Sequence, residues 1–150
     1  MTKGTMLAKA LHLATNAHDG QFDKGGNPYI LHPLKVMHYL KSADEELQCI
    51  ALLHDVIEDT SVTYADLAAE GLSLRVIEGV QALTKQKGYS YEHYKDQVMA
   101  NRDAMQVKMA DLRHNTDIRR LKGVREKDLQ RMAKYQAFYL ELRDKLETTK

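Results

Sequence analysis

The two prolines of this 150-residue chain, Pro28 and Pro33, lie close together, and the remainder of the chain has none. Proline removes a backbone N–H and breaks the interior of a helix, so most of this sequence is free to be helical. No run of β-branched residues alternates for long enough to predict a strand. Apolar residues instead recur at helical spacing, as in the stripe Leu129, Met132, Tyr135, Tyr139 and Leu142. The sequence therefore predicts an all-α fold.

Cap residues divide the chain into several short helices. We expect a first helix over 5–17, and then a loop over 20–28, where two glycines and a proline interrupt the pattern. A second helix is expected to begin near Pro33, and a third after Asp44 that continues through Val56. Further helices are expected to begin at these caps: Thr63 in a capping box with Asp66, Ser73, Ser90, Asp103, and a last start near Lys127.

Length and composition limit the number of domains and the kinds of partner that we expect for this chain. The length indicates one domain over 1–150, and 22 basic against 21 acidic residues give a formal charge of +1. That balance argues against a nucleic-acid partner held by bulk charge, and the basic run Arg119, Arg120, Lys122 and Arg125 is expected to be a solvated face. No stretch approaches about 18 consecutive apolar residues, so no membrane partner is expected. The lone cysteine, Cys49, excludes an intrachain disulfide and favours a cytoplasmic location.

A polar face appears on segment 51–60, whose opposite face is apolar. At about 100° per residue, one histidine and three carboxylates fall on one side of this helix: His54, Asp55, Glu58 and Asp59. Carboxylates this close repel one another unless a cation lies among them. Imidazole nitrogen and carboxylate oxygen suit Mn²⁺, Fe or Zn²⁺. The segment therefore predicts a divalent metal site, with an acidic solvated helix face as the alternative.

Two other segments carry weaker signals. His32 directly precedes Pro33, and a packed or exposed histidine would account for it. In segment 107–115, Lys108, Asp111 and Asn115 share one helical face, which is also the pattern of an ordinary surface ion pair. Neither segment alone identifies a site.

Taken in order, these segments resemble the HD-domain metal-dependent phosphohydrolases, and in particular the hydrolase domain of the Rel/Spo proteins and their small stand-alone relatives. The matching stretches are AHDGQ at 17–21, GNPYILHP at 26–33, ALLHDVIEDT at 51–60 and VKMAD at 107–111, followed by His114 and Asn115. The His-Asp pair alone is common, whereas this series of motifs is specific.

The resemblance implies a compact multi-helix HD-domain bundle and an enzyme that removes the 3′-pyrophosphate from the small nucleotide (p)ppGpp. It also implies one divalent metal ion, expected to be Mn²⁺, with four ligands: His32, His54, Asp55 and Asp111. Glu58 and Asp59 match the acidic pair that handles the attacking water. The expected substrate contacts are Lys24, Lys108, Asn115 and Tyr135.

The chain departs from the family pattern in two places. Before His114 the family has Arg-Leu, whereas this chain has Leu112 and Arg113. The other departure lies in the loop near Pro28. The alarmone hydrolases have Arg-x-Ser ahead of the Pro-Tyr-Ile motif, whereas this chain has Asp23 and Gly25 there. Because a carboxylate cannot stack on a base as a guanidinium does, hydrolysis of another nucleotide or phosphorylated metabolite stays open as an alternative. A non-catalytic nucleotide-binding relative is a further alternative, against which the intact Glu58–Asp59 pair argues.

Overall fold

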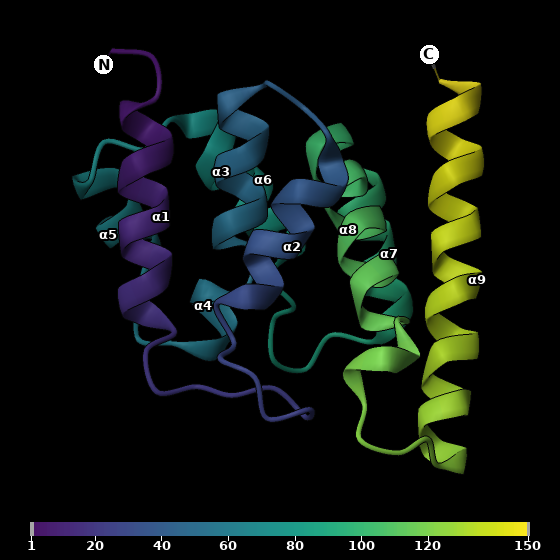
Figure 1. Cartoon of the computed structure of the whole chain (residues 1–150). Coiled ribbons are helices and arrows are strands. Elements are labelled where there is room, and N and C mark those ends of the chain that lie inside the picture. Colours follow the sequence, from purple (N-terminus) through teal and green to yellow (C-terminus); the bar gives the residue numbers. More distant parts are fainter. Residues whose placement is uncertain (1, 150) are drawn as a thin grey trace.

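The computed structural model describes residues 2–149, and within that range nine α-helices and one 3₁₀-helix form the fold (Figure 1). In order they are α1 Thr5–Ala17, α2 Leu31–Leu40, α3 Glu45–Leu53, α4 Val56–Asp59, α5 Tyr64–Ala69, α6 Leu74–Leu83, α7 Tyr91–Met99, α8 Arg102–Asn115, η1 Ile118–Arg120 and α9 Glu126–Thr148. The all-α prediction is therefore confirmed. None of the helices described is both long and apolar enough to cross a membrane.

Four helices begin at a predicted cap residue, whose side chain satisfies a backbone N–H of the first turn. The first helix has its predicted bounds, and Thr63 and Asp66 cap each other's backbone in a capping box. The other confirmed caps are Asp44 at α3, Ser73 at α6 and Ser90 at α7.

Two local predictions were wrong, and one short element was not predicted. The cap of α8 is Asn101, which accepts a hydrogen bond from the Ala104 N–H, whereas Asp103 lies inside the helix and accepts from Arg75 at 2.8 Å. The third helix ends at Leu53 rather than continuing through Val56, and α4 starts after a turn at residues 54–55. The short η1 was not expected, and its cap is the side chain of Asp117.

Helix α3 lies at the centre of the bundle, in contact with α1, α2, α6 and α8. Its last five residues, 49–53, are all buried, in keeping with their uniformly apolar character. Figure 1 shows α1 and α9 on opposite sides of the molecule, with α8 between α9 and the centre. A helix surrounded in this way fixes whatever follows its C-terminus, which here is the turn at His54 and Asp55.

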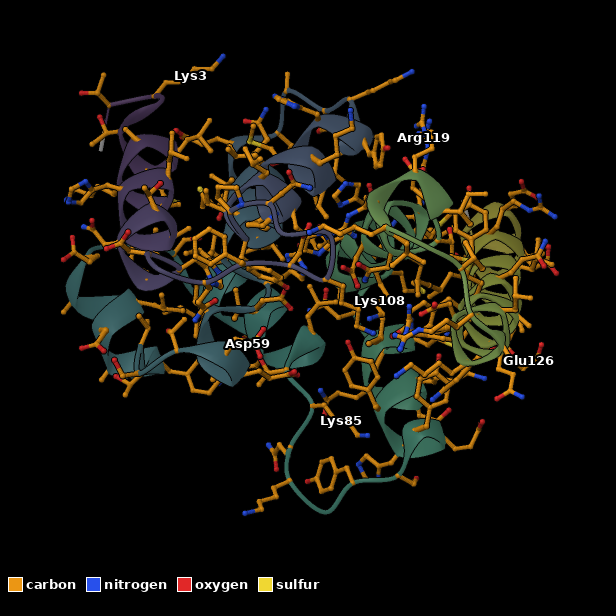
Figure 2. The ribbon with its side chains drawn as sticks, turned by 60° about the horizontal axis from the view of Figure 1, so that its bottom comes forward. Lys3, Asp59, Lys85, Lys108, Arg119 and Glu126 are labelled. Atoms are coloured by element: carbon orange, nitrogen blue, oxygen red, sulfur yellow. The ribbon has the colours of Figure 1, made fainter. Side chains whose placement is uncertain are left out.

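Several connecting segments gather at one end of the bundle, at the bottom of Figure 1. They are the loop before α2, the short α4, the loop between α6 and α7, and the segment that leads from α8 to α9. Figure 2 brings this end forward, with Lys108 near the middle of the face and Lys85 on the loop after α6. Two polar residues singled out from the sequence, Asp59 and Lys108, are labelled on this face in Figure 2.

The close packing of α6 on α3 generates a prediction about Gly79. A Cβ at this position would lie 2.5 Å from Ile50 Cδ1 and 2.9 Å from its Cγ1, and both residues are buried. Overpacking costs about 1–3 kcal/mol, which exceeds the roughly 1 kcal/mol by which alanine favours a helix over glycine. We therefore expect Gly79→Ala to lower the free energy of unfolding, as measured by urea denaturation.

Two comparisons make this test specific. Ile50→Val removes the nearest clashing methyl group, so the double variant should lose less stability than the two single variants predict together. Gly123→Ala, where a Cβ meets no atom within 4 Å, should leave stability nearly unchanged. An unchanged midpoint for Gly79→Ala would show that Ile50 moves aside at no cost.

Candidate metal centre

The four predicted metal ligands converge from three parts of the chain. His32 comes from the first turn of α2, His54 and Asp55 from the turn between α3 and α4, and Asp111 from α8. His54 Nε2 lies 3.0 Å from Asp55 Oδ2 and 3.3 Å from Asp111 Oδ1. His32 Nε2 lies 2.8 Å from Asp111 Oδ1 and 3.8 Å from Asp55 Oδ2. The structure thus brings together residues up to 79 positions apart.

The backbone carbonyl of Ala51 fixes the orientation of the His54 ring. Its Nδ1 lies 2.6 Å from the Ala51 carbonyl oxygen, which can only accept, so Nδ1 carries a proton and donates it. Its Nε2 then faces the two carboxylates, and it is buried without a hydrogen-bond partner among the described residues. A neutral imidazole would therefore direct a lone pair at carboxylate oxygens, an arrangement that a cation between them would stabilise. This donor set fits a divalent metal.

The carboxylates of Asp55 and Asp111 favour a positive charge at His54 Nε2. Burial alone would lower the pKa of His54, but Asp55 and Asp111 outweigh it and hold that pKa well above its usual range. Burial would likewise raise the pKa of Asp55, yet His54 lowers it to about 2. The carboxylate of Asp55 is further oriented by Tyr29, whose hydroxyl donates to Oδ2 at 2.5 Å. A bound metal would take the place that a proton on His54 otherwise holds.

Lys108 is paired with a metal-ligand candidate. Its ammonium donates to Asp111 Oδ2 at 2.9 Å, which leaves Oδ1 facing the two histidines. Burial would raise the pKa of Asp111, but the charge of Lys108 and the hydrogen-bond contact with His32 hold that pKa well below its usual range. The predicted role of Lys108 toward substrate stays a prediction, although its side chain does line a cavity.

His114 is a contact of the site for which the sequence suggested no role. Its Nδ1 lies 2.7 Å from Nδ1 of His32, with the two rings inclined by 14°. Both ring nitrogens of His32 are therefore engaged, Nδ1 by His114 and Nε2 by Asp111. The only sequence signal for His114 was its place in the last matching motif.

Of two neighbouring cavities, the first is lined by members of the cluster, and the second by Tyr29 and Asn115, which bond to Asp55 and Asp111. Tyr135 of α9 lines both cavities. The first, of about 250 Å³, is lined by His54, Asp55 and Asp111 together with Glu58, Lys85 and Lys108. The second, of about 310 Å³, is lined by Asp23, Lys24, Tyr29, Asn115, Arg120 and Arg131, among others. All four predicted substrate contacts, Lys24, Lys108, Asn115 and Tyr135, thus line one cavity or the other.

The two acidic residues predicted to handle water differ in position. Glu58 lines the first cavity, and its Oε1 accepts a hydrogen bond from the backbone N–H of Lys85. Asp59 does not line that cavity, and its backbone carbonyl accepts from the Gln21 side chain at 2.9 Å. Burial raises the pKa of both carboxyls, and nearby Asp55 raises both further. Glu58 is therefore the better placed of the two to exchange a proton with a molecule in the cavity.

Asp23 and Gly25, which depart from the family pattern in the loop before α2, both lie against Arg120. Asp23 Oδ2 accepts from Arg120 Nη2 at 3.2 Å, and a Cβ on Gly25 would lie 2.2 Å from the Arg120 carbonyl oxygen. Side chains at 23 and 120 are only 13% and 19% exposed. The expectation that Arg120 belongs to a solvated face was therefore wrong, because a partner 97 residues away holds it against the cavity.

Two curated proteins are similar in sequence to most of this chain. The Haemophilus influenzae protein named guanosine-3′,5′-bis(diphosphate) 3′-pyrophosphohydrolase is 37% identical over 134 residues, which cover 81% of this chain and 20% of that protein. The Escherichia coli K12 bifunctional (p)ppGpp synthase/hydrolase SpoT is 37% identical over 140 residues, which cover 85% of this chain and 20% of that protein. This chain thus spans about 20% of the length of these curated relatives.

A solved structure titled as a metazoan orthologue of SpoT that hydrolyzes ppGpp has the same fold. It superposes with a TM-score of 0.77 at 22% identity and covers 95% of this chain and 87% of that one. A family model described as the HD domain matches residues 10–137, most of the chain and all four members of the cluster. On this evidence the protein belongs to the HD-domain family.

Proposed function

We propose that this protein is a metal-dependent phosphohydrolase that removes the 3′-pyrophosphate from (p)ppGpp. In this reaction water adds to the phosphorus bound to the ribose 3′ oxygen, and that P–O bond breaks. Pyrophosphate leaves, and the 3′ oxygen takes up a proton, so that ppGpp yields GDP. The names of the curated relatives support this substrate, and the cavities beside the cluster offer room for a nucleotide.

One observation carries the proposal: the buried Nε2 of His54 faces two carboxylates and lacks a hydrogen-bond partner among the residues described. Such an arrangement costs free energy unless a cation or a proton occupies the point where the three groups meet. Held by His32, His54, Asp55 and Asp111, a divalent ion, which we propose to be Mn²⁺, would acidify a water molecule and polarise a phosphoryl oxygen.

The remaining residues supply proton transfer and charge. Glu58 lines the same cavity as the cluster, and its raised pKa suits a group that accepts a proton from the attacking water. Asp59, next in the chain, assists through its negative charge. Lys108 and Lys24, one in each cavity, offset the charge of the phosphates. Tyr135 borders both cavities and would contact the nucleotide between its two ends.

A second substrate class is favoured by a specific observation. Asp23 and Arg120 form an ion pair in the wall of the 310 Å³ cavity, where the Rel/Spo pattern has an arginine from the loop itself. This altered wall favours a different nucleotide or phosphorylated metabolite, hydrolysed by the same cluster.

Turnover measurements separate these possibilities. We expect the purified protein to release pyrophosphate and GDP from ppGpp when Mn²⁺ is added, and to lose that activity with a chelator. Products would be identified by chromatography, and a panel of other nucleotides would be tested in parallel. Hydrolysis of another nucleotide but not ppGpp would support the second substrate class, and metal binding without any turnover would make the protein a binding module.

The role of Glu58 leads to a separate prediction. Glu58→Gln keeps an oxygen that can accept from the Lys85 N–H, so the loop should stay in place. The amide cannot accept a proton from water, and general-base catalysis contributes about 10²–10⁴-fold. We therefore expect kcat to fall by about two orders of magnitude or more while Mn²⁺ content by elemental analysis stays at the wild-type value.

Glu92→Gln on α7 is the matched control, because that side chain is 78% exposed and, among residues 2–149, its one ion pair is with Lys95. It should leave both kcat and metal content unchanged. Near-wild-type turnover of Glu58→Gln would remove Glu58 from the mechanism, and loss of the metal would make Glu58 a ligand.

A further inference from the structure

The last turn of α8 contacts two of the metal-ligand candidates. The Asn115 amide donates from Nδ2 to Asp111 Oδ1 at 3.0 Å. Nδ1 of the adjacent His114 lies 2.7 Å from Nδ1 of His32. Asp111 Oδ1 is the same oxygen that lies 3.3 Å from His54 Nε2. Residues that hold metal ligands in this way set the direction of their lone pairs and commonly change metal affinity 10–100-fold when replaced.

Arg120 holds this turn from the other side. Its Nη1 donates to the Asn115 side-chain oxygen at 3.0 Å and to the His114 carbonyl at 3.2 Å. Because a guanidinium only donates, the oxygen of the Asn115 amide must face Arg120, and its NH₂ group must then face Asp111. The Asp111 carboxylate, which only accepts, requires the same orientation, so Arg120 and Asp111 hold the amide from its two ends.

Asp23 in turn holds Arg120. Its Oδ2 accepts from Arg120 Nη2, while its Oδ1 accepts from the backbone N–H groups of Gly25 and Asn27 at 3.0 and 2.9 Å. The pair is mostly shielded from solvent, so salt screens it less than a surface pair. The backbone of Gly25 also lies so close to the Arg120 carbonyl that a side chain there would clash.

These contacts form one continuous chain, Asp23–Arg120–Asn115–Asp111, from the loop before α2 to the cluster. We infer that Arg120 is a positioning residue of the metal centre: held by Asp23, it orients the Asn115 amide and through it the Asp111 carboxylate. This inference rests on the metal site of the proposed function. It assigns to Asp23 and Gly25 a role in shaping the metal centre from the wall of the neighbouring cavity.

The test is the Mn²⁺ dissociation constant of the full chain, measured by electron paramagnetic resonance of the free ion. Arg120→Met removes the donors and should weaken Mn²⁺ binding by about tenfold, the lower end of the range for residues that directly support a ligand. Arg119→Met is the matched control, because that neighbouring side chain is 84% exposed and its one ion pair in the described part of the chain is with Asp117. It should bind Mn²⁺ as the wild type does.

A double-mutant cycle of Arg120 and Asn115 tests whether Arg120 acts on Asp111 through the Asn115 amide. If Arg120 acts through Asn115, Arg120→Met should add little to the loss already caused by Asn115→Ala. Additive losses, or wild-type affinity in Arg120→Met, would overturn the inference. A wild-type protein that binds no Mn²⁺ would instead contradict the proposed function itself.

Folding is checked by circular dichroism without metal. If Arg120→Met does not fold, Arg120→Lys replaces it, since lysine keeps the charge beside Asp23 but loses the fork that reaches Asn115 and the His114 carbonyl. The lysine variant should then show the weakened binding, and wild-type affinity in that variant would overturn the inference equally.

Discussion

The meeting of one buried imidazole nitrogen with two carboxylates is the interaction on which the rest of this structure depends. His54 Nε2 faces Asp55 and Asp111 because the Ala51 carbonyl holds its other nitrogen. That carbonyl belongs to the last turn of α3, the most enclosed helix of the bundle. The apolar core and the polar cluster are thus built on one helix, so packing around α3 and the geometry of the candidate metal centre are coupled.

Surrounding residues limit the cost of gathering acidic groups in the interior. Lys108 occupies one oxygen of Asp111, Tyr29 donates to Asp55, and His114 engages the far nitrogen of His32. Each contact leaves one nitrogen or oxygen atom directed at the common centre. A site built in this way is ready for a small cation before the cation arrives, and it excludes alternative side-chain arrangements in which the carboxylates pair with histidines pointing elsewhere.

Local signals in the sequence predicted much of the fold. Caps such as Thr63 with Asp66 and Ser90 act over three residues, so they could be recognised without tertiary structure. The break at His54–Asp55 could not be predicted, because the segment reads as one continuous helix. In the structure the His54 ring bonds to the Ala51 carbonyl at this break. The metal-ligand candidates came from the motif series. The prediction that Arg120 lies on a solvated face was wrong because its partner Asp23 lies 97 residues away. No local sequence pattern distinguishes an arginine held in an ion pair from a solvated one.

Crystals grown with Mn²⁺ would test the central claim most directly, through an anomalous difference map at the manganese absorption edge. The account predicts one strong peak within bonding distance of four residues: His32, His54, Asp55 and Asp111. The side chains of Asn115 and His114 should keep their contacts to Asp111 and His32 beside it. A peak bound by other residues would contradict the account. So would the absence of a peak at saturating Mn²⁺, with the four side chains still in contact with one another.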